Sequence, residues 1–218
     1  LEILHQNFEN ILLEFTATLD YESREIAEKY KDKVIYKYDL AQFRTDKFSK
    51  EINLVRSLYD EQERIIQALI LNLYRQELAT VHHINLKPVI LFKAKKTIKE
   101  SEQNKENFHK LIDAFSETMV DKIRKTSTVA IVQKAFDFFE GRNISKGDIV
   151  KRIQNHFREE NCLSANNDSE AEKNQILLNT LEEENNPIRA VFAVQKLNEG
   201  WDVLNLFDIV RLYEDRDG

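Results

Sequence analysis

The sequence predicts an α/β fold in which a parallel sheet is flanked by helices. Short, continuous apolar runs rich in β-branched residues recur along the chain, and long segments of helical period separate them. Continuous runs of this length are typical of strands buried on both faces. Strands that alternate with helices favour a layered sheet with right-handed crossovers. The expected strands are residues 11–17, 34–38, 89–92, 190–194 and 206–210.

Local signals support several of these elements. Pro88 and Pro187 stand just ahead of two expected strands, where a proline removes no hydrogen bond from the sheet. The first long helix is expected over 53–79, with Leu58, Ile65, Leu69 and Leu73 on one face.

The remaining helices are predicted from their caps. Thr97 and Glu100 form a capping-box pattern for a helix over about 98–124. A third helix is expected to end with Gly141 as its C-terminal cap. The last two expected N-caps are Asp148, for a helix through Arg158, and Ser169, for one over about 170–184.

Composition sets the bounds on function. The 218 residues can form one large domain or two small ones, and the net charge of −6 argues against a general nucleic-acid coat. A motor that grips a strand through backbone amides and a few lysines is still compatible with this charge. No apolar run reaches the roughly 20 residues that cross a bilayer, no secretory signal opens the chain, and the single Cys162 suits a reducing cytoplasm. We therefore expect a cytoplasmic protein without a membrane partner. The opening Leu1 suggests a fragment.

Several apparent sites do not satisfy the chemistry that they suggest. GRNISKGD (141–148) has its Lys-Gly pair in the reverse order of a phosphate loop. His82 and His83 are adjacent, so on a helix they point about 100° apart and cannot share a metal. His156 with Glu159 and Glu160 is typical of a solvated face, Cys162 has no second thiol, and no Glu-x-Lys nuclease motif occurs. We expect no metal site and no complete catalytic centre.

The stretch EGWD (199–202) follows the expected strand 190–194 and includes one of the chain's four glycines. At the carboxyl end of a parallel strand, Gly200 would let the backbone approach a phosphate or sugar, and Asp202 could accept bonds from a ribose or an arginine. The alternative is a tight turn in which Trp201 plugs the sheet edge. The local pattern supports both interpretations.

Three segments, in order, resemble the helicase motors of superfamily two, and most closely the restriction (Res) subunits of type III restriction-modification systems. They are Thr16-Ala17-Thr18 after an apolar run, PVILFKA (88–94) and EGWDV (199–203). VIYKYDLAQF and KTIKESEQN also look like these subunits, so the resemblance covers nearly the whole chain. It implies a RecA-like sheet. It also implies that residues 1–20 are the tail of a first lobe and 21–218 a second lobe, with helical elaboration around 53–80 and 98–160.

The resemblance also implies roles for residues. Thr16, Ala17 and Thr18 would couple nucleotide state to the grip on DNA, and Gly200 and Asp202 would bind nucleotide. Lys93, Lys95 and Lys96 follow the strand 89–92 and could contact phosphates, although a solvated lysine cluster is the alternative. Two positions depart from the family pattern. Leu19 stands where many members have proline, and Val194 stands where many relatives have a DNA-contacting threonine.

The motor implied by this resemblance is incomplete in this sequence. It has no Gly-Lys-Thr phosphate loop, no Asp-Glu-x-His box and no arginine-bearing sixth motif. ATP and Mg²⁺ are therefore expected in a longer parent, which would act on DNA with a modification (methyltransferase) subunit and carry endonuclease activity elsewhere. The chain alone is expected to be inactive and to bind neither cofactor. Two alternatives stay open, a DNA-repair or RNA helicase lobe and a non-enzymatic helical protein-interaction module.

Overall fold

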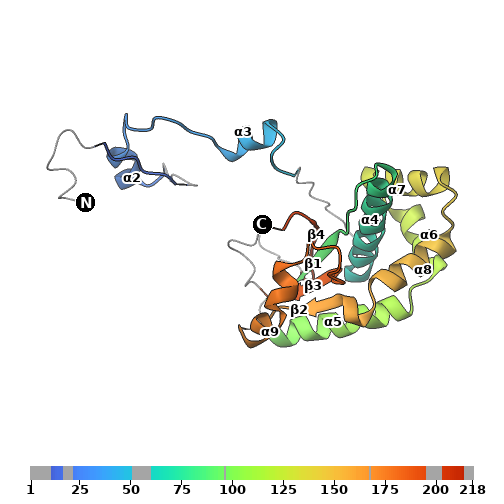
Figure 1. Ribbon diagram of the computed structural model, residues 1–218. Coiled ribbons are helices and arrows are strands. Elements are labelled where there is room, and N and C mark those ends of the chain that lie inside the picture. Colours follow the sequence, from blue (N-terminus) through green and yellow to red (C-terminus); the bar gives the residue numbers. More distant parts are fainter. Residues whose placement is uncertain are drawn as a thin grey trace. The chain divides into compact units, whose positions relative to one another are not determined.

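The structure is a computed structural model, drawn as a ribbon in Figure 1. The chain divides into two compact units, Leu1–Leu54 and Val55–Gly218. The predicted division into lobes at residue 20 stays a prediction. The structure describes residues 11–16, 22–50, 60–95, 97–166, 168–194 and 203–213, with the backbone alone over 168–173.

The described part of the first unit contains two short helices, α2 (Arg24–Lys29) and α3 (Leu40–Thr45). The prediction of strands over 11–17 and 34–38 is wrong for the residues that the structure describes, because 11–16 and 34–38 have no strand pairing and are exposed. An apolar run becomes a strand only where a neighbouring strand satisfies its backbone groups. Neither run has such a neighbour within the described part of this unit.

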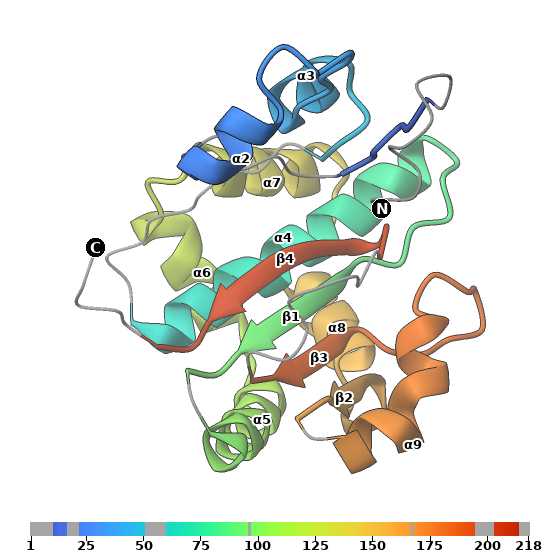
Figure 2. The same ribbon diagram turned by 90° about the vertical axis from the view of Figure 1, so that its left-hand side faces the viewer.

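The second unit is built on a four-stranded parallel sheet, which confirms the predicted α/β class (Figure 2). The runs around 89–92, 190–194 and 206–210 are confirmed as strands. The three-residue strand β2 was not predicted. The strand order is β2 (Cys162–Ser164), β3 (Ala190–Ala193), β1 (Val89–Lys93) and β4 (Leu206–Arg211).

Helices cover both faces of the sheet. On one face, α4 (Glu61–Val81) packs on β1 and β4, and α5 (Ile98–Asp113) packs on β2 and β3. The 3₁₀ turn Glu159–Asn161 leads into β2, and α9 (Asp168–Asn179) contacts β2. Leu178 of α9 and Leu181, which follows it, share a second apolar cluster with Val89 and Val191. The sheet is therefore the middle layer of three.

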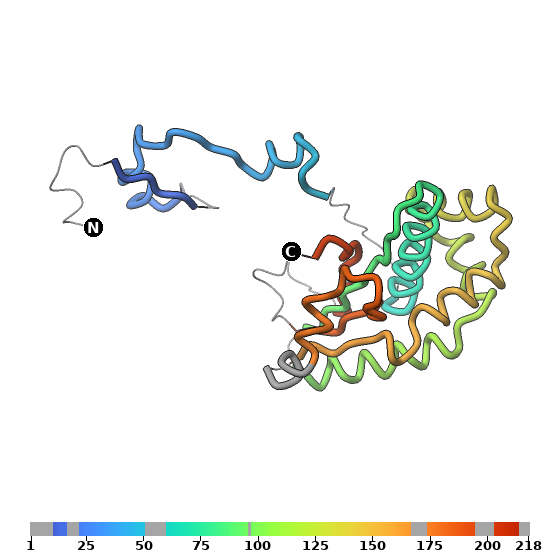
Figure 3. Tube along the Cα trace, viewed as in Figure 1, coloured from blue at the N-terminus to red at the C-terminus, as the bar shows by residue number. Residues whose placement is uncertain are grey.

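The predicted helical elaboration is confirmed. The helices α6 (Glu117–Thr126) and α7 (Ala130–Gly141) pack on α4, and α8 (Lys146–His156) joins α4, α5 and α6 (Figure 3). Ion pairs tie these helices together. Lys122 Nζ lies 2.7 Å from Glu63 Oε1, and Arg152 Nη1 lies 2.6 Å from Glu77 Oε1.

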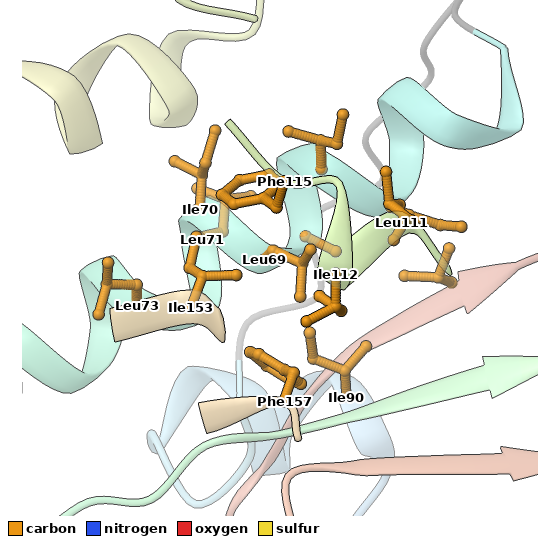
Figure 4. Packing of buried hydrophobic residues seen from close by; sticks show 14 of the residues in the cluster. Leu69, Ile70, Leu71, Leu73, Ile90, Leu111, Ile112, Phe115, Ile153 and Phe157 are labelled. Atoms are coloured by element: carbon orange, nitrogen blue, oxygen red, sulfur yellow. The ribbon is translucent and has the colours of Figure 1, made fainter. Parts of the chain in front are cut away.

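The main core lies between the sheet and these helices. In Figure 4, Leu69 of α4, Ile112 of α5 and Phe157 after α8 converge above Ile90 of β1. The rings of Phe92 and Phe192 stack across β1 and β3 with centroids 4.9 Å apart. Burial of these side chains holds the helical layer on the sheet.

Several predicted helix boundaries are wrong. The first long helix is capped by Asp60 rather than beginning at 53; residues 51–59 lie outside the described residues. The expected helix 98–124 is two helices, because Phe115 turns into the core and Ser116 caps a new helix. The capping box of Thr97 and Glu100 is confirmed.

The caps around α7, α8 and α9 also differ from the prediction. Gly141 is the last residue of α7 rather than its cap, the C-cap is Arg142, and Asn143 has a positive φ of 57°. Ser145 caps α8, and Asp148 is its partner in a capping box. The helix α8 ends at His156, before Arg158, and α9 already begins at Asp168, so Ser169 lies inside it. Within the described residues, no helix is both long and apolar enough to span a membrane.

Candidate functional site

The carboxyl edge of the sheet carries basic side chains at the ends of two neighbouring strands. Lys93 ends β1 and Arg211 ends β4, and the two residues are paired in the sheet register. The pairing continues one step further, because Leu212 N donates to Lys93 O over 2.9 Å. Lys93 is half-buried and Arg211 is exposed. In open parallel sheets this edge is where ligands bind.

Beyond the strands, Lys95 remains at the same edge. Ala94 N donates to Ala193 O over 3.0 Å, which holds the exit of β1 against the end of β3. Lys95 Nζ lies 5.9 Å from the centroid of the Tyr213 ring, a cation–π distance. Lys96 lies outside the described residues. Among the described residues, the edge thus holds three cations and an aromatic ring.

The sequence prediction found Lys93 and Lys95 but missed Arg211 and Tyr213. A usable signal existed, because the run 206–210 was expected to be parallel to the run 89–92. Residues that follow two parallel strands lie at the same edge of the sheet. If residues 93–95 are candidate ligand contacts, residues 211–213 are therefore candidates too. The prediction treated each strand end separately.

The ends of β2 and β3 add polar groups to this edge. Ala165 N donates to Phe192 O over 2.8 Å, so the chain leaves β2 beside β3. Asn166 follows, buried, and Asn174 Nδ2 of α9 donates to Ser164 O over 3.0 Å. The side chains of Asn166 and Asn174 therefore add polar groups beside the end of β2, whereas β3 ends in the apolar Ala193.

The amino edge is closed by buried amide side chains. Asn72 of α4 is fully buried, and its Nδ2 donates to Pro88 O over 3.0 Å. Its Oδ1 accepts from Arg189 Nη2 over 2.8 Å. Burial lowers the pKa of Arg189 to about 10, and its guanidinium lies 5.7 Å from the centroid of the Phe157 ring.

Two further residues seal the same edge. Lys87 Nζ donates to the carbonyl oxygens of Glu183 and Asn186, and burial, with Arg189 nearby, lowers its pKa. Asn205 Nδ2 donates to Lys87 O over 3.0 Å and to Leu181 O over 2.6 Å. Most of these polar groups of the amino edge hold the fold, although Arg189 Nε and Asn205 Oδ1 have no hydrogen-bond partner within the described residues. The carboxyl edge is the candidate site because parallel sheets bind ligands there.

Strand β4 is fixed to the helical layer by an ion pair. Arg75 Nη1 of α4 lies 2.5 Å from Asp208 Oδ2, and its guanidinium lies 5.7 Å from the centroid of the Phe207 ring. Burial raises the pKa of Asp208, and the attraction of Arg75 opposes this rise. The pair positions β4, and with it Arg211, at the candidate site.

The remaining predicted site residues lie either in the first unit or outside the described residues. Thr16 lies in the first unit, exposed and outside any strand, and Ala17 and Thr18 lie outside the described residues. Gly200 and Asp202 also lie outside them. The described residues before and after EGWD lie at opposite edges of the sheet. Strand β3 ends at the carboxyl edge, and β4 begins at the amino edge, where Leu206 pairs with Val89.

The described residues do not form a metal site. No group of three or more His, Cys, Asp or Glu side chains among them could hold an ion. Burial is the main cause that lowers the pKa of His156 to about 4 and raises that of Cys162 to about 12. The Cys162 thiol is therefore protonated near neutral pH and is not a nucleophile.

Fold and site together define an α/β lobe with a basic, polar carboxyl edge, consistent with the RecA-like class. The chain is 38% identical over 233 aligned residues to the probable type III restriction-modification enzyme HindVIP Res subunit of Haemophilus influenzae. The similarity covers 96% of this chain and 44% of that protein, so the chain spans less than half the length of its relative. This match confirms the predicted resemblance to type III Res subunits. No family model and no solved structure matches the chain.

Proposed function

We propose that this chain is part of the ATP-dependent DNA translocase or helicase motor of a type III restriction subunit. The observation that carries the proposal is the 38% identity to a Res subunit along 96% of the chain. The parallel sheet supports it, because motors of this kind place nucleotide and nucleic acid at the carboxyl edges of such sheets. In this proposal the second unit supplies the second lobe.

The basic residues of the carboxyl edge would contact the DNA backbone. Lys93 and Lys95 were the predicted contacts, and Arg211 adds a planar donor at the end of the adjacent strand. Lys96 belongs to the same proposed group. Because the phosphate contacts are few, the affinity should be weak and salt-sensitive with a shallow slope, and each contact should contribute about 0.9 log unit of affinity per tenfold change in salt concentration.

The proposal assigns nucleotide binding to Gly200 and Asp202, and coupling between lobes to Thr16, Ala17 and Thr18. ATP in the longer protein would supply the energy of movement. A cationic carboxyl edge suits its phosphates. The described residues hold no group of side chains that fits Mg²⁺. We therefore place the Mg²⁺ ligands and the γ-phosphate cradle in the longer protein.

The proposal includes the partners of such a motor. The Haemophilus protein is described as the probable Res subunit of a type III restriction-modification enzyme. A longer protein of the same kind would act in the cytoplasm on DNA, with a modification subunit and an endonuclease activity of its own. Without the rest of the motor, the 218-residue chain should not hydrolyse ATP.

The test is the substitution Asp202→Asn in the longer protein. If Asp202 bonds a ribose hydroxyl or an arginine when the cleft closes, the lost charge-assisted bond should lower DNA-stimulated turnover by about ten- to a hundredfold. The melting temperature should change little. Phosphate release would be measured with DNA, with RNA and without nucleic acid.

The matched control is Asp137→Asn, which removes an exposed carboxylate on α7. Its turnover should equal that of the wild type. If Asp202→Asn has wild-type turnover but a lowered melting temperature, EGWD is a structural turn and Asp202 does not bind nucleotide. Stimulation by RNA but not by DNA would replace the restriction motor with an RNA helicase.

A further inference from the structure

Four aromatic side chains form a continuous row in the first unit. The rings of Tyr36 and Tyr38 are stacked with centroids 6.2 Å apart. Tyr38 meets Phe43 edge-on at 5.9 Å, and Phe43 meets Phe48 at 5.7 Å. We call these four residues the aromatic row. Such contacts usually build a core, where the rings are covered by other side chains.

In this unit the row is not covered. Tyr36 is 78% exposed and Phe48 is 70% exposed, so both ends of the row present open ring faces. The two inner rings, Tyr38 and Phe43, are still 39% and 37% exposed. Exposure of this much aromatic surface costs free energy and marks an interaction site.

Local hydrogen bonds hold the row in place. Tyr36 and Tyr38 are two residues apart, and their stacked rings lie on the same side of the chain with 14° between their planes. The hydroxyl of Tyr38 donates to Asp46 Oδ2 over 2.7 Å, and this bond raises the pKa of Tyr38 to about 12. Phe48 N donates to Phe43 O over 3.1 Å, so the last two rings are linked through the backbone. The row is thus preorganised before a ligand arrives.

The surroundings of the row are basic. Residues 31–50 contain six Lys and Arg but three Asp, a net charge of +3, in a chain whose net charge is −6. Two of the three acids are already engaged. Asp39 accepts from Gln42 N over 2.9 Å and lies 3.5 Å from Lys37 Nζ, and Asp46 holds Tyr38. A polyanion with flat apolar groups complements this surface.

We propose that the aromatic row is a stacking platform for single-stranded nucleic acid. Bases stack on exposed ring faces regardless of their identity, and lysines track the phosphates between them. An apolar protein partner would complement this surface less well than a nucleic acid. It would bury the neighbouring lysines without supplying negative charges to pair with them, which costs free energy. The proposal goes beyond the motor function, since stacking on this row requires neither ATP nor the carboxyl edge of the sheet.

The experiment is fluorescence anisotropy of the 218-residue chain with a labelled oligothymidylate at low salt. Tyr36→Ala and Phe48→Ala should each weaken binding by about fivefold or more, the loss of one stacked base. Tyr36→Phe keeps the ring and should bind like the wild type. The matched control is Phe15→Ala, which removes a 91% exposed ring of the same unit outside the row.

A second measurement separates stacking from general charge attraction. An oligonucleotide carrying the fluorescent base 2-aminopurine should change its emission on binding to the wild type, and much less with Tyr36→Ala. Single-stranded RNA and duplex DNA form two further arms, and the duplex should bind more weakly because its bases are already stacked.

Equal binding by Tyr36→Ala, Phe48→Ala and Phe15→Ala would overturn the proposal. So would a preference for duplex, or no binding of single strands at low salt. None of these results bears on nucleotide turnover in the longer protein, so the motor proposal fails or stands separately.

Discussion

At the scale of single residues, His156 shows how burial can outweigh a helix terminus. His156 is the last residue of α8, a position where the helix dipole favours a charged imidazole. Burial acts in the opposite direction and, with Arg189 and Arg152 nearby, lowers the pKa of His156 to about 4. Nδ1 of His156 is buried and has no hydrogen-bond partner within the described part of the chain. The imidazole is therefore held neutral.

This neutral state makes stability depend on pH. In the unfolded chain His156 takes a proton below about pH 6.5, whereas in the folded chain it does so only near pH 4. The stability that neutral His156 contributes to the folded state is fully present above about pH 6.5 and is lost as the pH falls toward 4. The loss should reach about 2–3 kcal/mol.

Urea unfolding at pH 7.5 and pH 4.5 checks this prediction. Between pH 7.5 and pH 4.5, the free energy of unfolding of the wild type should fall by about 2 kcal/mol more than that of His156→Gln. The pKa of His109 is also lowered, mainly by burial, but His109 is present in both proteins and cancels in the comparison. The same loss in both proteins would contradict the prediction.

Residue-scale prediction from sequence succeeded where a local pattern existed and failed where the partner was remote. The apolar run before Lys93 and Lys95 is visible in the sequence, so both were predicted at the end of a strand; Lys93 is the last residue of β1 and Lys95 follows it. The bond between Asn72 and Arg189 joins residues 117 positions apart, and no local pattern announces it. Whether Gly200 and Asp202 bind nucleotide stays a prediction.

At the scale of elements, the runs that became strands are those whose neighbours could be paired. Val89–Lys93 and Ala190–Ala193 pair with each other and are buried, as their continuous apolar composition predicts. Residues 34–38 have a similar composition but are exposed and unpaired within the described first unit. Strand β2 was missed because CLS is too short to form a visible run. Composition thus gives a tendency, and pairing decides the outcome.

Helix caps offer a paired test at this scale. Ser145 caps α8 with a full capping box, in which Asp148 N donates to Ser145 Oγ over 3.1 Å. Ser145→Ala should lower the free energy of unfolding by about 1 kcal/mol.

The matched control is Ser116→Ala, because Ser116 occupies the N-cap of α6 without a side-chain cap bond. It should cost less than about 0.5 kcal/mol. Chemical denaturation of both variants measures the difference. Equal losses would mean that the capping box contributes nothing to stability.

At the scale of the whole molecule, stability resides in the second unit. Both apolar clusters lie between residues 65 and 212, and no described residue of the first unit is buried. Deletion of residues 1–54 should therefore leave the thermal transition of the remaining chain within about 2 °C of the full chain. The same deletion removes the aromatic row and should weaken single-strand binding to the level that the basic carboxyl edge of the sheet provides alone.

Differential scanning calorimetry of both chains tests this expectation. A fall of more than about 5 °C would show that the first unit contributes to the core. An unchanged transition with full single-strand binding would instead place the nucleic-acid surface in the second unit.

The parallel pairing of β1 has a consequence for the order of folding. Ile90 in the central strand pairs with Ala190, one hundred residues later, and with Asp208, later still. At roughly 5–20 residues per second, a ribosome needs about 5–20 seconds to supply those partners. During that interval the helices after β1 can gather on one face by short-range contacts, but both edges of VILF stay open. The nascent chain would therefore depend on chaperones, or on rapid synthesis, to keep this strand from pairing with another copy of itself.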